Sequence, residues 1–344
     1  MEYRAFGSTG LQSSAIGFGS WPMAGRSYGG IDEGAATAAV RRALEVGVNC
    51  FDTAPAYGLG EAEMMLGRAL GAHRDEVILV SKCGITVPPG GTVAIRDNSP
   101  VAIIRDVEVS LRRLGTDHLD VVLLHWPEAV TPVEESMLAL DALVNDGKTR
   151  FVGVSNFGLD QLRACVSVRR VDVVQVGYHL FDRRMEPDIL PYCAANGVAV
   201  MGYGSLGHGL LTGAFTARTS FDADDWRSVG VVFGQPLLRA GNFQQNVAVV
   251  DRIGREIAAP RGVPVAQIAL AWVLENGAIS TALVGARTPG EVDANRDAVG
   301  LHLTGEELRR IDEIMLGAAG RVSEFRPLDD SMEQWGPEIE SRTA

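Results

Sequence analysis

The feature of this sequence that most constrains its fold is a regular alternation of short apolar runs with amphipathic segments. Helix start signals open several of these segments, such as Asp32-Glu33 before residues 35–46 and Ser99-Pro100 before residues 101–114. Alternating strands and helices are typical of a parallel sheet covered by helices on both faces. The apolar runs, bounded by Gly, Asp or Asn, lie at residues 15–18, 49–53, 77–82, 119–125, 151–155, 172–176, 198–203 and 280–285.

About eight such strand and helix units in 344 residues are what a closed (β/α)8 TIM barrel requires. We therefore predict an α/β fold in which residues 1–344 form a single barrel domain. An N-terminal β-hairpin is expected at about residues 3–14, the barrel at about residues 15–300, and a C-terminal helix and tail at about residues 301–344. A doubly wound open sheet is the alternative.

The region after the seventh predicted strand departs from the alternation of strands and helices. Residues 204–242 form a long connection that contains Gly, Asp and Arg, and such loops within compact domains usually act as lids or binding loops. Extra helices are expected at residues 243–258 and 264–274, and a last one at residues 304–316, opened by the capping-box residues Thr304 and Glu307. Residues 202–207 match G-x-G-x-x-G, but no helix follows at once, so a Rossmann site is not favoured.

Charge and cysteine content exclude several classes of function. The net charge is −12, and the scattered basic residues form no patch for nucleic acid or anionic lipid. The cysteines show no C-x-x-C pair or His-rich neighbour that would suggest zinc, so no metal is expected. The N-terminus lacks a signal-like pattern, and no apolar stretch approaches the ~20 residues that span a bilayer. We expect a cytoplasmic protein without nucleic-acid or membrane partners.

Four polar residues lie at or just after the ends of apolar strands, where the active site of such a barrel is found. Asp52, Lys82 and His125 each end a predicted strand, and Tyr57 follows in the loop after Asp52. Taken singly, each has an ordinary structural role, such as a solvated cap, a barrel-rim lysine, a loop aromatic or a core histidine. All four together are better explained by a catalytic site.

Lys82 carries most of this argument, because lysine occurs only at Lys82 and Lys148 in a chain that otherwise uses arginine. An ammonium is a compact charge whose pKa shifts on burial, whereas a guanidinium stays protonated. A buried Lys82 needs a counter-charge, which Asp52 can supply. A phenol beside that ammonium loses its proton more readily, so Tyr57 would act as the general acid toward a carbonyl oxygen, with His125 as a second donor.

The sequence resembles the aldo-keto reductases over about residues 1–318. The resemblance rests on FDTAPAYGLGEAEMMLGRAL at residues 51–70, followed in order by LVSKCG, LLHWP, FVGVSNF, LLTG and VGAR, and it is nearest to bacterial members of the general-stress or inositol-operon type. It implies a (β/α)8 barrel that reduces aldehydes or ketones, or oxidises the corresponding alcohols, by direct hydride transfer with NADP(H). Asp52, Tyr57, Lys82 and His125 would be its catalytic tetrad.

The same resemblance implies the contacts to the cofactor. Amides and hydroxyls would bind the carboxamide, Tyr203 would stack on the nicotinamide ring, and small residues would let backbone N–H groups approach the pyrophosphate. Gly285, Arg287 and Asn295 would lie at the adenosine end. The full implied set is Ser20, Trp21, Asp52, Ser155, Asn156, Gln175, Tyr203, Ser205, Leu206, Gly209, Gly285, Arg287, Glu291 and Asn295.

Departures from the family pattern bear on the choice of cofactor. Ala214 in LTGAF replaces a lysine that helps to hold the pyrophosphate, and Arg218 is a candidate substitute. Arg287 can hold a 2′-phosphate bidentately, whereas Glu291 would repel it and could accept hydrogen bonds from a ribose diol. NADP(H) is the preferred cofactor on this balance, and NAD(H) stays possible.

The expected substrate is a small or medium carbonyl compound or alcohol held by an aromatic wall. Two other functions stay open: a cofactor-sensing regulatory subunit that resembles the β-subunits of voltage-gated potassium channels, and a non-redox barrel enzyme that uses Lys82 as a Schiff base. Neither the oligomeric state nor the identity of the substrate follows from the sequence. The residues expected in the wall are Trp21, Tyr28, Tyr57, Trp126 and Phe157.

Overall fold

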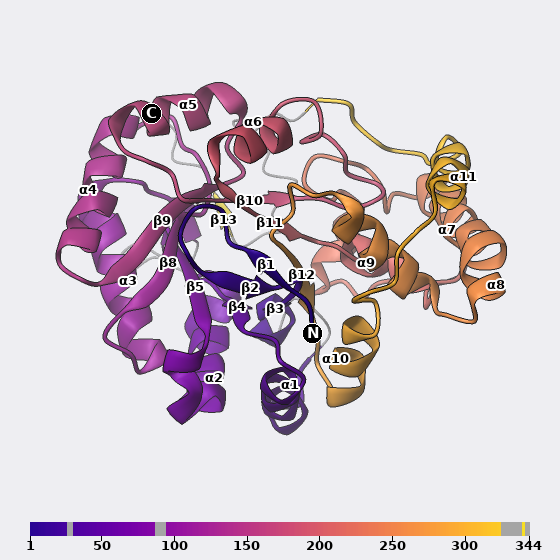
Figure 1. The fold of residues 1–344 in the computed structure, drawn as a ribbon, viewed down its shortest axis with the longest axis horizontal. Helices are drawn as coiled ribbons and strands as arrows, with labels where there is room; N and C mark the ends of the chain where they lie inside the picture. The colour runs from indigo at the N-terminus through magenta and orange to yellow at the C-terminus, as the bar shows by residue number, and fades with distance from the viewer. Residues whose placement is uncertain (26–29, 87–93, 325–338, 341–344) are drawn as a thin grey trace.

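The computed structural model describes residues 1–25, 30–86, 94–324 and 339–340. Eight parallel strands close into a barrel, as the sequence predicts, so the doubly wound alternative is wrong (Figure 1). Each expected strand is present, with bounds that differ by no more than a few residues. Around the barrel the strands are β3 (Ile16–Gly19), β4 (Cys50–Asp52), β5 (Ile78–Cys83), β8 (Leu119–Leu124), β9 (Thr149–Ser155), β10 (Val173–Gly177), β11 (Ala199–Tyr203) and β12 (Thr281–Gly285).

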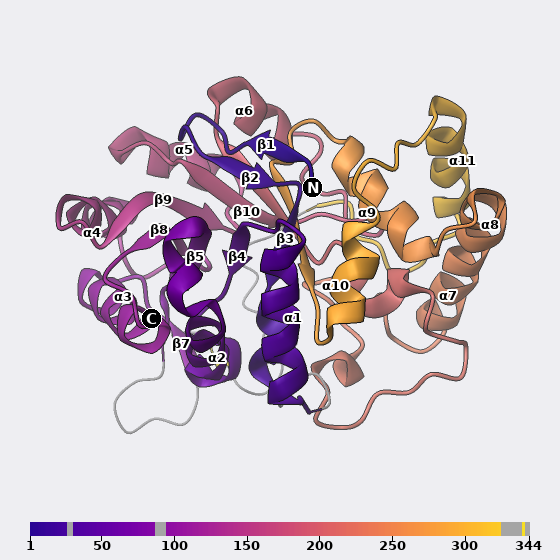
Figure 2. The same cartoon turned by 60° about the horizontal axis from the view of Figure 1, so that its bottom comes forward.

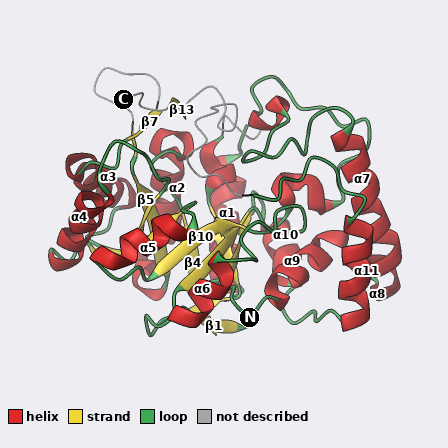
Figure 3. Ribbon diagram, turned by 90° about the horizontal axis from the view of Figure 1, so that it is seen from above, coloured by secondary structure: helices red, strands yellow, loops and turns green. Residues whose placement is uncertain are grey.

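Helices surround the strands, as Figures 2 and 3 show. The expected start signals operate in two of them: the Asp32 carboxylate accepts a hydrogen bond from the Ala35 N–H, and Ser99 caps a helix whose first residue is Pro100. These helices are α1 (Glu33–Glu45), α2 (Glu61–Leu70), α3 (Pro100–Leu114), α4 (Val133–Asn145), α5 (Leu159–Val168), α6 (Ile189–Asn196), α9 (Val265–Glu275) and α10 (Pro289–Arg296).

The hairpin of β1 (Tyr3–Ala5) and β2 (Gln12–Ser14) lies across one end of the barrel (Figure 1). Phe6, directly after β1, is fully buried in a cluster with inward-facing strand residues such as Val121 and Met201. The inside of the barrel is therefore a packed core and not a pore. With this end filled, the opposite end, where the strands terminate, is the end at which a ligand site is expected.

Three further helices, α7 (Asn242–Ile253), α8 (Ala259–Arg261) and α11 (Gly305–Met315), lie beyond α9 on one side of the barrel (Figure 1). The helix predicted over residues 243–258 is not regular throughout, because residues 254–258 form a wider π-helical turn. Pro260 accounts for the irregularity, since its ring excludes the carbonyl four residues earlier and it has no N–H to donate. Thr304 and Glu307 form the expected capping box of α11.

A small second sheet lies after β5. It contains β6 (Ile85–Thr86), β7 (Ala94–Arg96) and β13 (Ile339–Glu340), so a part of the tail that sequence patterns left unassigned pairs with the loop after β5. No single helix in the described part of the chain is long and apolar enough to cross a membrane. The segment Asn242–Arg261 and α9 pass that test only as a pair, on length and composition, and they are bent by 89°.

Gly153 in β9 offers a test of how closely the barrel strands approach. A Cβ at this position would lie 1.9 Å from the Val173 carbonyl oxygen on β10, whereas a Cβ at Gly254, which has an ordinary helical φ, would meet nothing within 4 Å. We expect Gly153→Ala to lower the free energy of unfolding by about 1–3 kcal/mol or more. Gly254→Ala should raise it by about 0.5–1 kcal/mol. Urea denaturation measures both, and equal stability of the two variants would contradict this packing.

Candidate active site

The four strand-end residues singled out from the sequence lie together at the carboxyl end of the barrel. Asp52 ends β4, Lys82 lies next to the end of β5, and His125 directly follows β8. Tyr57 begins a short turn after β4. Because β4, β5 and β8 are neighbours in the barrel, their ends converge on one point.

The Lys82 ammonium is the centre of this cluster. Its side chain is fully buried, and its Nζ lies 2.8 Å from both carboxylate oxygens of Asp52 and from the Thr53 carbonyl oxygen, and 3.2 Å from the Tyr57 hydroxyl. The Gln175 amide on β10 donates a 2.7 Å hydrogen bond to Asp52. A buried ion pair persists only when its remaining hydrogen-bonding capacity is used. Here the Thr53 carbonyl oxygen and the Tyr57 hydroxyl accept from Lys82, and the Gln175 amide donates to Asp52.

Burial and pairing act in opposite directions on these two charges. Burial lowers the pKa of Lys82, and the charge of Asp52 opposes that change. Burial raises the pKa of Asp52, which the ammonium and the Gln175 amide oppose. Each charge thus depends on its neighbour, because neither is solvated by water.

His125 lies beside Tyr57, and their rings meet edge to face with centroids 5.9 Å apart. Burial, together with the positive charges of Lys82 and Arg96, holds the pKa of His125 well below 6.5. The imidazole is therefore neutral near pH 7 and can donate a hydrogen bond from one nitrogen only. Its Nδ1 is buried and has no hydrogen-bond partner among the described residues.

Asn156 joins several strand ends at this edge of the barrel. Its amide nitrogen donates to the His125 carbonyl oxygen (3.1 Å) and to the Ser155 hydroxyl (3.0 Å), and its amide oxygen accepts from the Tyr203 hydroxyl (2.8 Å). Its backbone φ of 64° is in the left-handed region, where asparagine is better tolerated than most residues. The structure thus brings together Ser155, Asn156 and Tyr203, as the resemblance implies.

Residues 204–212 form a tight turn after β11, and the G-x-G-x-x-G pattern in it opens no α-helix, so the Rossmann interpretation is excluded. Gly207 and Gly209 have positive φ, and a Cβ at Gly209 would lie 2.7 Å from the Phe215 ring. Ser205 is buried and Leu206 is half-buried in the same turn. The positive φ and the contact with Phe215 both require glycine at Gly209, whose backbone N–H donates to the Leu206 carbonyl oxygen (3.1 Å).

Besides the His125 Nδ1, the buried polar atoms at this end of the barrel that have no partner among the described residues include the Ser20 hydroxyl and the His208 Nε2. Ala214 and Arg218 are both exposed on the loop that follows. Arg227, which sequence reasoning did not single out, reaches the turn, where its guanidinium donates to the His208 carbonyl oxygen (3.5 Å).

At the end of β12, Arg287 and Glu291 contact each other. Glu291 accepts hydrogen bonds from the Arg287 backbone N–H (2.7 Å) and guanidinium (3.1 Å), and both side chains are partly exposed. Thr288 caps α10 through the Glu291 N–H. The Asn295 amide donates to the Gly285 carbonyl oxygen at 3.5 Å. Arg287 and Glu291, whose expected effects on a 2′-phosphate are opposite, therefore form an ion pair with each other.

Aromatic rings surround the tetrad. Trp21 stacks on Tyr57, with ring centroids 6.0 Å apart, and Trp126 follows His125. Phe157, expected in the same wall, lies in the main hydrophobic core, and none of the described ring contacts joins it to this group. Tyr28, also expected there, lies outside the described residues. The rings that sequence reasoning missed come from the long connection after β11 and are His208, Trp226 and Phe233.

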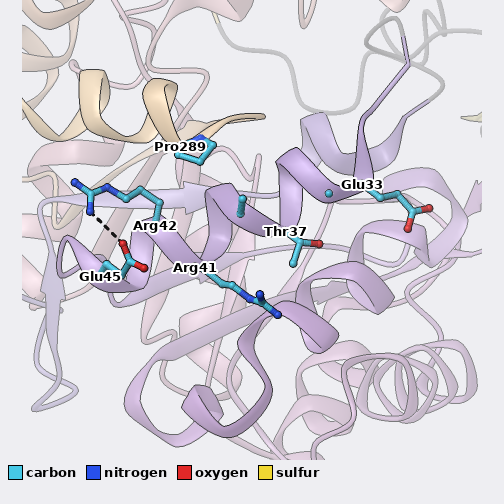
Figure 4. A pocket seen from close by; sticks show the side chains of 8 residues that line it. Glu33, Thr37, Arg41, Arg42, Glu45 and Pro289 are labelled. Carbon is cyan, nitrogen blue, oxygen red and sulfur yellow. Dashed lines mark hydrogen bonds and ion pairs between the residues drawn. The ribbon is translucent and has the colours of Figure 1, made fainter.

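A surface pocket lies elsewhere, between the outer face of α1 and the start of α10 (Figure 4). Glu33, Thr37, Arg41 and Pro289 line it, and Arg42 pairs with Glu45 at its edge. This pocket contains none of the tetrad residues. The described residues include no cluster of His, Cys, Asp and Glu that could hold a metal ion.

Comparisons with known proteins show the family of this chain. Residues 15–316 match the aldo/keto reductase family. The NADH-specific methylglyoxal reductase of Escherichia coli is 30% identical over 318 residues, which cover 88% of this chain and 95% of that protein. The glycerol dehydrogenase AKR11B4 from Gluconobacter oxydans has a TM-score of 0.82 and 35% identity, and the match covers 96% of this chain and 98% of that structure.

A further solved structure, an aldo-keto reductase from Klebsiella pneumoniae in complex with NADPH, has a TM-score of 0.73 and 30% identity. The match covers 96% of this chain and 99% of that one. The family match takes in every residue of the Lys82 cluster, and both solved structures superpose over nearly the whole chain. The protein is therefore a member of the aldo/keto reductase family.

Proposed function

We propose that this protein is an oxidoreductase that uses NADP(H) or NAD(H) to reduce aldehydes and ketones, or to oxidise the corresponding alcohols. The observation that carries the proposal is the fully buried Lys82 ammonium, which contacts the Asp52 carboxylate and the Tyr57 hydroxyl at once. The bound cofactor would supply the hydride. The residues of the chain would bind the carbonyl compound and move the proton.

Tyr57 is the proposed general acid. Its hydroxyl gives its proton to the carbonyl oxygen, and the ammonium 3.2 Å away stabilises the phenolate that remains. Asp52 keeps Lys82 charged and in place, so it acts through Lys82. Neutral His125 donates a second hydrogen bond to the same oxygen and orients the carbonyl carbon.

The described residues fit a dinucleotide at this end of the barrel. The Ser20 hydroxyl and the His208 Nε2 are buried without a partner among the described residues, so both have hydrogen-bonding capacity left for a ligand. We propose that Ser155, Asn156 and Gln175 hold the carboxamide, Tyr203 the nicotinamide ring, and Ser205, Leu206 and Gly209 the pyrophosphate. The adenosine end would contact Gly285, Arg287, Glu291 and Asn295.

NADP(H) is the preferred cofactor in this proposal, and NAD(H) stays possible. The solved Klebsiella pneumoniae relative is in complex with NADPH, whereas the Escherichia coli relative is NADH-specific. Arg287 offers a cation to a 2′-phosphate, but its ion pair with Glu291 offsets part of that attraction. Relatives named for methylglyoxal and glycerol support a small carbonyl compound or alcohol as the substrate.

The Schiff-base alternative is disfavoured, because the Lys82 nitrogen is already surrounded by four oxygen acceptors and its side chain is inaccessible. No observation favours a role as a regulatory subunit over an enzyme. We propose a cytoplasmic location, supported by four buried cysteines that form no disulfide.

Replacing Tyr57 by Phe tests the proton donor. We expect Tyr57→Phe to lower kcat/KM for an aldehyde by about 10²–10⁴-fold, because it removes the general acid. The dissociation constants of NADPH and NADH, measured by fluorescence titration, should stay close to those of the wild type. Tyr192→Phe removes a hydroxyl from the outer helix α6 and should retain full activity. A Tyr57→Phe enzyme with most of the wild-type rate would contradict the assignment.

The pH profile tests the state of His125. Because its pKa lies well below 6.5, the imidazole should be neutral across the range in which an ordinary histidine titrates. We expect the kcat/KM of the wild type to show no inflection near pH 6.5. An inflection there that disappears in His125→Gln would show that the histidine titrates normally and would refute this protonation state.

Replacing Glu291 by Gln tests the cofactor preference. Loss of the carboxylate frees the Arg287 guanidinium and removes a negative charge, so the affinity for NADPH relative to NADH should rise about fivefold, the equivalent of about 1 kcal/mol for an exposed charge pair. Glu306→Gln removes a carboxylate from the first turn of α11 and serves as the control. An unchanged ratio of dissociation constants in Glu291→Gln would show that Glu291 does not select the cofactor.

A further inference from the structure

Phe233, in the long connection after β11, is held in place by its backbone. Its φ of 45° lies in the left-handed region, which is unusual for a bulky residue. Val232 and Gln235 exchange two backbone hydrogen bonds across it (2.7 and 2.9 Å). The Arg184 guanidinium donates to the Phe233 carbonyl oxygen (3.0 Å). A strained conformation persists only where its surroundings impose it, so this loop tip is fixed.

Arg184, which holds the Phe233 carbonyl oxygen, is itself fixed in position. Arg184 makes two hydrogen bonds to the Asp182 carboxylate (2.8 and 2.7 Å), and both side chains are buried. Asp182 in turn lies in a turn closed by its backbone bonds with His179 after β10. The position of Phe233 is thus set by the segment that follows β10 as well as by its own loop.

The Phe233 ring fills the space between the two tryptophans that flank the tetrad. Its centroid lies 6.2 Å from those of Trp21 and Trp126, and the ring is nearly parallel to Trp126 (18°). It also meets Tyr203 edge to face at 5.3 Å. Because Trp21 stacks on Tyr57, the three rings form a continuous wall around the approach to the Tyr57 hydroxyl.

We propose that Phe233 sets the upper size limit of the carbonyl substrate and restricts the enzyme to small, unbranched aldehydes and ketones. This inference rests on the proposed function and adds the residue that determines specificity. A bulky acyl group would have to displace a ring whose backbone is held by Arg184 and by the Val232–Gln235 bridge. A small carbonyl compound reaches Tyr57 without that displacement.

The test compares propanal with 2-naphthaldehyde for the wild type, Phe233→Ala and Phe233→Leu. We expect Phe233→Ala to raise the kcat/KM ratio of 2-naphthaldehyde to propanal about tenfold or more, since the fit of a pocket to one or a few carbon atoms changes selectivity by about that much. Phe233→Leu should give an intermediate ratio. The dissociation constant of NADPH is measured for each variant to show that the site is intact.

Phe221→Ala is the matched control. Phe221 belongs to the same long connection, but its ring packs against Phe215 and Phe243, away from the tetrad. Its loss should leave the selectivity ratio unchanged. If Phe233→Ala and Phe233→Leu lowered both activities in proportion, Phe233 would have only a structural role and the inference would be wrong. If the wild type reduced neither aldehyde with either cofactor, the proposed function itself would fail.

Discussion

The site depends on the ion pair between Lys82 and Asp52. Both side chains are removed from water, so each charge is tolerated only because the other is present. The pair, completed by Gln175, joins β4, β5 and β10 at the carboxyl end of the barrel and fixes an ammonium beside the Tyr57 hydroxyl. Removing one partner of a buried pair typically costs about 3–5 kcal/mol, so stability and chemistry at this site are coupled.

The long connection after β11, residues 204–242, contributes to the same site as the strand ends. The barrel supplies the polar groups, and the connection returns aromatic rings, among them Trp226 and Phe233, to the same end. The Arg184–Asp182 pair ties that connection to the end of β10. A buried polar cluster with an aromatic wall beside it follows from these two parts together.

Much of the fold was predictable, because apolar runs and helix caps are local signals. The strand ends also predicted where Asp52, Lys82 and His125 would converge, since parallel strands terminate on one face. The aromatic wall was only partly predictable: the length of the loop indicated a lid, but its ring contacts depend on the backbone path. Phe157 is expected in the wall but is buried in the main hydrophobic core. The four-residue spacing of Arg287 and Glu291 is compatible with an ion pair, but the sequence alone does not show which partner each charge takes.

The central claim is that Lys82 acts through the proton of Tyr57. Single-turnover hydride transfer, followed by nicotinamide absorbance in Lys82→Met, Tyr57→Phe and the double variant, tests it most directly. If the two residues act as one unit, the double variant should be no slower than Tyr57→Phe alone, because no proton donor remains for the ammonium to assist. Losses that multiply in the double variant would mean that Lys82 and Tyr57 act independently, and would contradict this account.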